Sequence, residues 1–174
     1  EPSDKNELFH WILTLAIAVI IALCVNRFVL VNAEIPSGSM ENTIMTGDRV
    51  FGNRLAYIFG EPKRFDIIIF RYPDDEKQLF IKRIIGLPGE TVEIHDGQIF
   101  IDGSKTPLKD VTTKEFMQGS FGPYTVPDNC YFVMGDNRNN SKDSRYWEHT
   151  FVTDDEIVGK AFLRYWPLNK IKFL

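Results

Sequence analysis

Two short segments of this chain carry side chains that could work together as a nucleophile and a base. The first, IPSGSM at positions 35–40, has a proline and a glycine on either side of its first serine. These residues force a turn and leave small hydroxyls on an open loop. The second segment is the apolar run 79–85, which contains Lys82. A loop serine such as Ser39 and a strand lysine can form a nucleophile–base pair without histidine. An ordinary turn and a surface lysine are the alternative interpretation.

The apolar run around Lys82 has the composition of a β-strand. Strand alternation places Phe80, Lys82 and Ile84 on one face, so the amine has large apolar neighbours. Burial disfavours the ammonium form and lowers the pKa of a lysine. A base near neutral pH needs a pKa of roughly 7–8, and desolvation can supply that shift. A structural lysine that reaches to the surface remains the alternative, unless Ser39 approaches it.

A second polar constellation occupies positions 135–147, after an apolar strand-like segment. Asp143 and Arg145 are two positions apart and could form an oriented ion pair, and Ser141 could offer a hydroxyl to a neighbouring amine. A long hydrophilic hairpin is the alternative. A metal site is discounted, because lysine and arginine accompany the carboxylates and no histidine pair lies nearby.

The three histidines stand apart from these segments. His10 lies at the start of an apolar run, His95 precedes a predicted turn, and His149 follows the polar loop. None belongs to a nucleophile motif, so structural roles are expected for all three. His149 is kept as a reserve candidate for a base.

A long apolar segment precedes the serine loop. Residues 8–25 contain no Asp, Glu, Lys or Arg, and as a helix they would be about 27 Å long. This length approaches the hydrocarbon core of a bilayer, so we predict a membrane anchor over 8–31 behind a short flank, 1–7. A signal peptide would be shorter and would need small residues at its cleavage site, and a buried helix would show a polar face. The chain starts with Glu1 instead of methionine, so we expect further residues upstream.

The remainder of the chain, 32–174, has the pattern of a β domain. Short runs rich in Val, Ile and Phe are bounded by Gly, Pro or Asp, at positions 48–54, 65–72, 79–85, 90–95, 130–134 and 157–166. Asp-Gly pairs at 96–97 and 102–103 predict tight hairpin turns. Residues 105–129 are polar and irregular and indicate a loop or a small lobe. A helical turn is expected at 55–59, and Thr153 with Glu156 could cap another. The expected fold is mainly β, an antiparallel barrel or sandwich behind one helix.

The overall composition is that of an ordinary globular chain. Hydrophobic residues make up 44% and charged residues 25% of its 174 residues. The net charge of −4 and the lack of a basic stripe argue against nucleic acid as a partner. Cys24 lies in the apolar run and Cys130 in a later strand, so no disulfide framework is predicted.

Three segments together resemble the signature boxes of the type I signal peptidases. They are IPSGSM at 35–40, KRIIGLPGE at 82–90 and GDNRNNSKDSR at 135–145, in the family's order and directly behind an apolar anchor. The resemblance implies a membrane-bound Ser/Lys endopeptidase that removes signal peptides from exported preproteins, with the antiparallel β fold shared by the LexA-type repressors. It implies that signal peptides and a lipid bilayer are the partners and that the protein is a monomer. It implies no cofactor.

The resemblance also assigns roles to individual residues. Ser39 would be the nucleophile and Lys82 the general base, with the Ser37 hydroxyl and the Ser39 N–H in the oxyanion hole. Ser141 would orient Lys82, and Asp143 and Arg145 would brace the site. Pockets for small residues at −1 and −3 of the cleavage site would be lined by Ile35, Pro36, Ile44 and Ile81, and also by Met40 and Phe80.

The expectation is therefore a bacterial cytoplasmic-membrane protein, single-pass as far as this chain extends, with an extracytoplasmic catalytic domain. A self-cleaving regulator of the LexA type is one alternative, and the anchor argues against it. An anchored β-barrel binding module without activity is another, and the intact serine and lysine argue against it. Organelle-membrane peptidases share the same three segments, so an organelle membrane is the alternative location.

Overall fold

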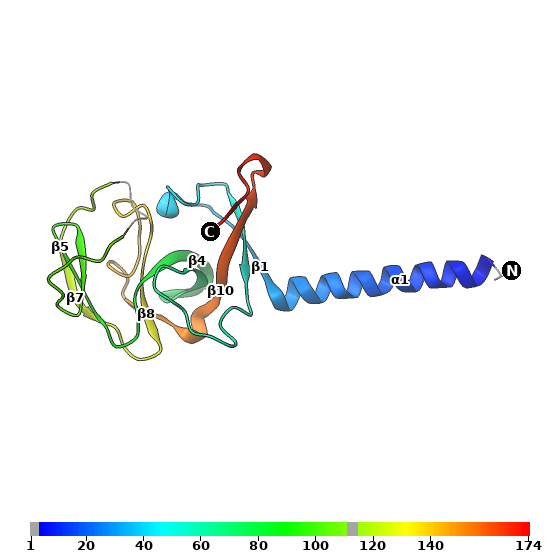
Figure 1. Cartoon of the computed structure of the whole chain (residues 1–174), viewed down its shortest axis with the longest axis horizontal. Helices are drawn as coiled ribbons and strands as arrows, with labels where there is room; N and C mark the ends of the chain where they lie inside the picture. Colours follow the sequence, from blue (N-terminus) through cyan, green and yellow to red (C-terminus); the bar gives the residue numbers. More distant parts are fainter. Residues whose placement is uncertain (1–3, 111–114) are drawn as a thin grey trace.

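The computed structural model describes residues 4–110 and 115–174, and it begins with one long exposed helix. Helix α1 (Asp4–Cys24) continues into a π-helical turn (Val25–Val29), and together they project away from the remaining chain (Figure 1). The stretch Asn6–Val29 is long and apolar enough to cross a membrane, by length and composition. The predicted anchor ran to residue 31, whereas Leu30 and Val31 already belong to strand β1 (Leu30–Glu34). The helix ends there because these two residues pair with the next strand.

The main body is a sheet of eight strands in which every pair is antiparallel, as the expected fold class requires. Its order is β1-β2-β10-β3-β4-β8-β9, and β11 pairs with β10. Besides β1, the strands are β2 (Arg49–Asn53), β3 (Ile67–Tyr72), β4 (Asp75–Gly86), β8 (Cys130–Met134), β9 (Val152–Thr153), β10 (Ile157–Trp166) and β11 (Lys172–Phe173). The mainly β, antiparallel prediction is confirmed, and every strand-like run found in the sequence forms a strand.

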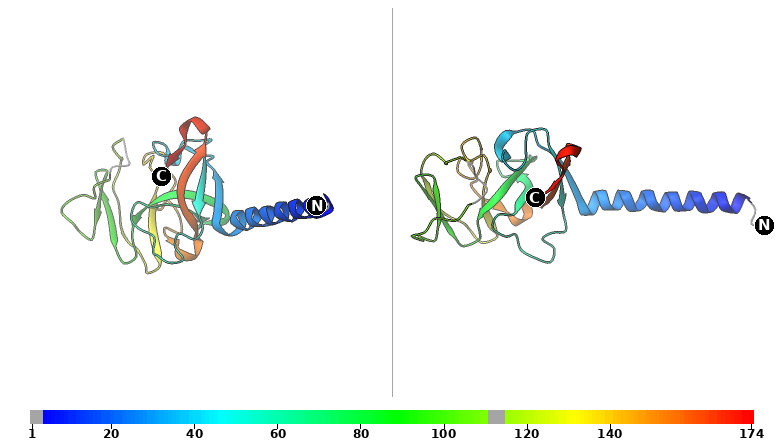
Figure 2. Two further views of the ribbon diagram at one scale, coloured as in Figure 1. Left: turned by 45° about the vertical axis from the view of Figure 1, so that its right-hand side comes forward. Right: turned by 45° about the horizontal axis from the view of Figure 1, so that its top comes forward.

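A second sheet of three strands, in the order β6-β5-β7, lies at the end of the domain away from the helix (Figures 1 and 2). It consists of β5 (Thr91–His95), β6 (Gln98–Ile101) and β7 (Phe121–Thr125). The small lobe was expected to be irregular over 105–129, and this is wrong for β7, which pairs with β5. Its glycine and proline hide the strand signal, since both residues are usually depleted in strands. Residues 111–114 of the predicted lobe lie outside the described residues.

The predicted turns form, with one difference. Asp96 and Gly97 both have positive φ angles and join β5 to β6 as a hairpin. Asp102 and Gly103 also have positive φ angles, yet this turn joins no pair of adjacent strands. Thr153 and Glu156 form the expected capping box, and residues 55–59 make a hydrogen-bonded turn.

The strands enclose three apolar clusters, and two of them meet at β3 and β4. Ile69 and Ile81 face one cluster, while Ile68, Phe70 and Ile84 face the other. The third cluster joins the two sheets, because Ile85 and Phe132 of the large sheet pack with Val92 of the small one. Adjacent residues of β4 therefore point into different clusters, and Lys82 lies within this packed region.

Candidate active site

Ser39 and Lys82 meet in the structure, although 43 positions separate them. Lys82 Nζ donates a hydrogen bond to Ser39 Oγ at 2.6 Å, and both residues are buried. Ser39 lies in a short 3-10 turn (Gly38–Met40) after β1, and Lys82 lies in the middle of β4. The alternative of a surface lysine and an unrelated turn is therefore excluded.

The environment of Lys82 favours the neutral amine. Burial lowers the pKa of Lys82 from 10.5 to about 8, and this effect outweighs the nearby carboxylates of Asp143 and Asp136, which raise it. The Phe80 ring lies on the same side of the strand, with its centroid 5.5 Å from Nζ. A neutral amine beside a hydroxyl can accept its proton, so this arrangement can activate Ser39 as a nucleophile.

A second hydroxyl lies beside the first. Ser37 Oγ is 3.4 Å from Ser39 Oγ and donates to it. Ser37 has an extended backbone and immediately precedes the 3-10 turn, so its side chain and that of Ser39 come to the same opening. The two hydroxyls and the amine form one small polar cluster, and all three residues line the same groove.

The loop 135–145 is braced from within by a buried ion pair. Asp143 is fully buried and contacts Arg145 at 2.8 Å (Oδ1 to Nε) and at 2.9 Å (Oδ2 to Nη2). Asp143 Oδ2 also accepts from the Gly135 N–H at 3.0 Å. Arg145 donates to the Arg138 carbonyl at 2.7 Å, and Arg138 donates to the Gly135 carbonyl at 2.9 Å. These contacts hold the two ends of the loop together. They also give each buried charge an oppositely charged partner and hydrogen bonds, which a buried ion pair needs.

Ser141 is buried against Gly135 and lies close to the 3-10 turn Gly38–Met40, called the serine turn below. A Cβ atom on Gly135 would be 2.3 Å from both Ser141 Oγ and the Ser39 carbonyl oxygen. Among the residues that the structure describes, Ser141 Oγ has no hydrogen-bond partner. The expected hydrogen bond from Ser141 to Lys82 is thus not formed in the structure.

A second buried ion pair, which was not predicted from the sequence, joins β4 to the loop 135–145. Arg83 contacts Asp136 through Nε and Nη2 at 2.7 and 2.6 Å, and it donates to the Phe65 carbonyl at 2.7 Å. Thr43, four positions after Ser39, donates to the same carboxylate at 2.5 Å. Asp136 therefore links the strand of Lys82 to the turn of Ser39. No local pattern indicates this pairing, since the partners lie far apart in the chain.

Ser39 and Lys82 are among the residues that line a groove of about 320 Å³. One wall comes from β1 and the residues after it, the other from β4, and Ile69 lies between them; the lining residues are Asn32–Ser37, Ser39, Ile69 and Gln78–Lys82. Of the six residues expected to line substrate pockets, Ile35, Pro36, Phe80 and Ile81 line this groove. Met40 and Ile44 do not, because both are fully buried in the apolar cluster. The groove also has lining residues that were not predicted from the sequence: Asn32–Glu34, Ile69, Gln78 and Leu79.

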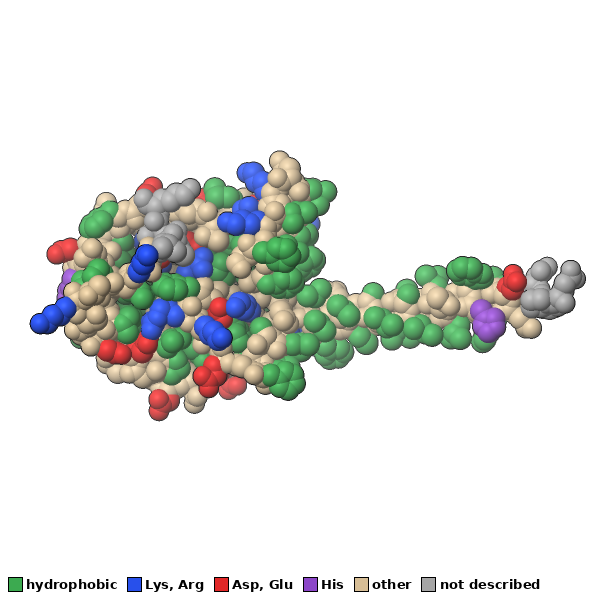
Figure 3. Space-filling view, in the orientation of Figure 1, with side chains coloured by type: hydrophobic (Ala, Val, Ile, Leu, Met, Phe, Trp, Pro, Cys, Tyr) green, Lys and Arg blue, Asp and Glu red, His purple; other side chains and the backbone are tan. Residues whose placement is uncertain are grey.

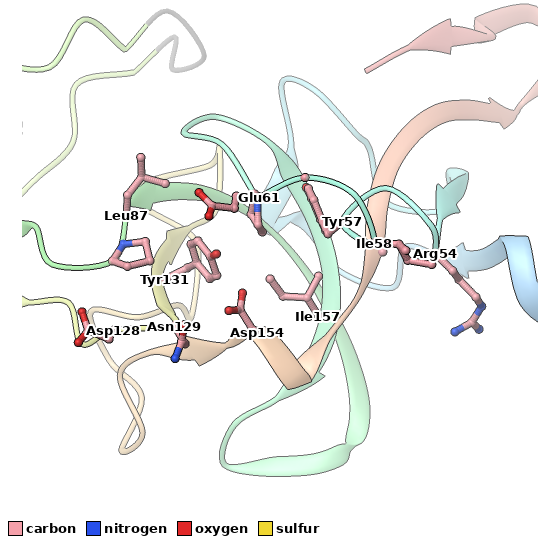
Figure 4. A pocket seen from close by; sticks show the side chains of 14 residues that line it. Arg54, Tyr57, Ile58, Glu61, Leu87, Asp128, Asn129, Tyr131, Asp154 and Ile157 are labelled. Atoms are coloured by element: carbon pink, nitrogen blue, oxygen red, sulfur yellow. The ribbon is translucent and has the colours of Figure 1, made fainter.

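Two other features lie apart from this pair. A larger cavity of about 990 Å³ is lined by residues such as Tyr57, Glu61, Tyr131 and Asp154, and neither Ser39 nor Lys82 belongs to it (Figure 4). His149, the reserve candidate for a base, is exposed and contacts Asp74 at 3.0 Å. The Ser39–Lys82 pair therefore lies in the smaller groove and outside the larger cavity.

Comparisons with known proteins identify the family of this chain. The family model described as "Signal peptidase, peptidase S26" matches residues 8–166. The signal peptidase I of Leptolyngbya laminosa is 38% identical over 178 residues, which cover 98% of this chain and 86% of the relative. The signal peptidase I S of Bacillus subtilis is 37% identical over 98% of this chain and 95% of the relative. A solved signal peptidase I from Enterococcus faecalis V583 is 37% identical with a TM-score of 0.49, over 57% of this chain and 96% of that chain.

The space beside Gly135 yields a test of the site. Gly135→Ala should abolish labelling of Ser39 by a serine-directed acylating inhibitor, because the methyl group would displace Ser141 or the Ser39 backbone. The matched control is Gly60→Ala, since a Cβ there meets nothing within 4 Å. Labelling followed by mass spectrometry measures both variants. Full labelling of Gly135→Ala would show that the serine turn and the loop 135–145 do not need this close packing.

Proposed function

The chain belongs to the type I signal peptidase family, peptidase family S26, and on that basis we propose that Ser39 and Lys82 are its catalytic pair. As a member of this family it is a serine peptidase that cleaves signal peptides from preproteins. The observation that carries the assignment of the pair is the buried 2.6 Å contact between Lys82 Nζ and Ser39 Oγ.

The proposed reaction uses the pair twice. Ser39 Oγ attacks the scissile carbonyl while neutral Lys82 takes the hydroxyl proton, and the resulting ammonium then gives a proton to the leaving amine. This produces an acyl-enzyme at Ser39. A water molecule, deprotonated by Lys82, attacks the ester carbonyl. The bond to Ser39 Oγ breaks, Oγ receives the proton from the Lys82 ammonium, and the signal peptide leaves with a new carboxylate. The Ser39 N–H and the Ser37 hydroxyl would stabilise the oxyanion in both steps.

We propose that the groove beside the pair binds the end of the signal peptide. Its lining includes part of the edge strand β1 and the middle of β4 (Gln78–Lys82), and a peptide strand could lie between them. Ile35, Pro36, Phe80 and Ile81 supply apolar surface close to Ser39. Bulky branched walls favour small side chains, which supports cleavage after small residues at −1 and −3. Asp143 and Arg145 would act indirectly, by fixing the loop 135–145 that packs against the serine turn.

We propose that residues 8–29 anchor the chain in the bacterial cytoplasmic membrane, with residues 32–174 as the extracytoplasmic peptidase domain and 105–129 as part of its variable lobe. The support is the apolar helix and its direct connection to β1, which leads to the serine turn. Apolar side chains also gather on the side of the domain from which the helix emerges (Figure 3). Trp166, Leu168, Ile171 and Phe173, on and around the β10–β11 connection, are all exposed. We expect the enzyme to act as a monomer.

The nucleophile assignment is tested with purified chain in detergent and a preprotein. Ser39→Ala should abolish cleavage at a site mapped by mass spectrometry, while the thermal unfolding of the variant stays close to that of the parent. Ser37→Ala should lose less, roughly 10²–10³-fold in kcat, as expected for one oxyanion-hole donor. Equal losses at both positions would contradict these two roles.

The lysine assignment predicts an alkaline pH profile. Lys82 acts as a base only when neutral, so kcat/KM should rise with pH through an apparent pKa of about 8. Lys82→Arg should be inactive although it keeps the charge, because a guanidinium stays protonated in this range. His149→Ala, a change at an exposed residue, is the control and should keep substantial activity. Normal cleavage by Lys82→Arg together with loss in His149→Ala would mean that histidine is the base.

The membrane assignment predicts that the catalytic domain itself prefers a lipid surface. A chain that lacks residues 1–28 keeps all of β1 and should still bind phospholipid vesicles in a sedimentation assay. Replacing exposed Leu168 and Ile171 with serine should weaken this binding, because apolar contact with the bilayer is lost. Phe116→Ser is the control, as Phe116 is 69% exposed and lies just before the β7 strand of the small sheet. A truncated chain that does not sediment with the vesicles would contradict the proposed position at the membrane.

A further inference from the structure

Asn137 holds the backbone on both sides of the nucleophile. Its backbone N–H donates to the Ser39 carbonyl at 3.0 Å, and its side-chain Nδ2 donates to the Gly38 carbonyl at 3.1 Å. Asn137 is half-buried in the loop 135–145. Both hydrogen bonds act on the backbone of the serine turn and leave the Ser39 hydroxyl to Lys82.

The Gly38 carbonyl and the Ser39 N–H belong to a single peptide group. This peptide bond is trans, and a trans peptide is planar with its C=O and N–H pointing in opposite directions. Any donor that fixes the direction of the Gly38 carbonyl therefore fixes the direction of the Ser39 N–H. The backbone N–H of Glu41 also donates to this carbonyl, at 3.1 Å, so the peptide plane is held by two donors.

Glu41 determines which way the Asn137 amide faces. Asn137 Nδ2 lies 3.4 Å from Glu41 Oε2, and the carboxylate lies over Gly38, where a Cβ would come within 2.7 Å of Glu41 Oε1. Both neighbours of Nδ2 are hydrogen-bond acceptors, so the amide must present its NH₂ group to them. Gly38, without a side chain, leaves the space in which the carboxylate and the amide meet.

We propose that Asn137, oriented by Glu41, is a positioning residue that aims the Ser39 N–H at the oxyanion formed during cleavage. The inference rests on the proposed function, since it takes Ser39 as the nucleophile and its N–H as an oxyanion donor. The oxyanion exists only after attack on the carbonyl. Loss of the Asn137 side chain should therefore weaken binding of the transition state and leave binding of the substrate unchanged.

The test compares Asn137→Ala and Asn137→Asp with Asn140→Ala, all in the full chain in detergent. Aspartate has nearly the shape of asparagine, but it offers no N–H to the Gly38 carbonyl and would repel Glu41. The backbone N–H of Asn137 remains in every variant. Asn140 is an exposed residue of the same loop, and its backbone N–H, which donates to the Asn137 carbonyl at 3.0 Å, is unaffected by the change.

Both Asn137 variants should lower kcat by about 10- to 100-fold. This loss is no larger than the lower end of the roughly 10²–10³-fold loss for removal of one oxyanion donor, because the Ser39 N–H is still present. KM, the apparent pKa of kcat/KM and the melting temperature should match those of Asn140→Ala. A peptide aldehyde, whose adduct with Ser39 carries the oxyanion, should bind more weakly by a similar factor. A matching peptide with a reduced scissile amide cannot form this adduct and should bind with unchanged affinity.

Two results would overturn the inference. The first is an unchanged kcat in Asn137→Asp, and the second is a loss of kcat accompanied by a shifted apparent pKa, which would mean that Asn137 acts through Lys82. If Asn137→Ala does not fold, the same measurements on Asn137→Asp decide the question. Failure of the proposed function is distinguishable, because Ser39→Ala would then still cleave in the chain with an intact Asn137.

Discussion

The structure depends on the burial of one amine beside one hydroxyl. A lysine pKa of about 8 instead of 10.5 corresponds to about 3 kcal/mol in favour of the neutral form, supplied by desolvation. The packing that desolvates Lys82 also brings Ser39 Oγ to 2.6 Å from Nζ. An exposed lysine in the same register would keep a pKa near 10.5 and would have a far smaller fraction of neutral amine at neutral pH. The apolar clusters around β3 and β4 are therefore part of the chemistry as well as of the fold.

Burying a lysine requires that the surrounding charges be paired. Two buried carboxylates, Asp143 and Asp136, oppose the loss of the proton from Lys82. Each is bound at the same time by an arginine, Arg145 or Arg83, through two short contacts. Pairing reduces the negative field at the amine and gives both carboxylates fixed positions. The Asp143–Arg145 pair fixes the loop 135–145 internally, and the Asp136–Arg83 pair joins this loop to β4 and, through Thr43, to the segment after Ser39. Charge compensation and positioning are thus achieved together.

Backbone contacts then complete the arrangement around the nucleophile. Gly135 lets the loop 135–145 approach the serine turn more closely than a side chain would permit. Asn137 uses this approach to bind two successive carbonyls of the turn. The loop contributes its main chain and a neutral amide to the nucleophile, while its charged residues remain behind. This division keeps the charged side chains of the loop 135–145 out of the groove beside Ser39.

The sequence alone predicted the apolar helix, the strands β2, β3, β4, β5, β8 and β10, and the segments that carry Ser39, Lys82, Asp143 and Arg145. These features depend on local pattern: an uninterrupted apolar run, strand alternation and short motifs of turn-forming residues. The sequence did not predict the edge strand β1 or the two-residue strands β9 and β11. Strand β7 was missed because Gly122 and Pro123 hide the pattern, and its pairing with β5 overrides their low preference for strands. Only the tertiary structure decided that Asp136 binds Arg83, that Asn137 holds the serine turn, and that Met40 and Ile44 lie in the core instead of the groove. The reason is physical: these contacts join segments up to 99 positions apart, and their partners are set by the order and register of the strands, which no local pattern encodes.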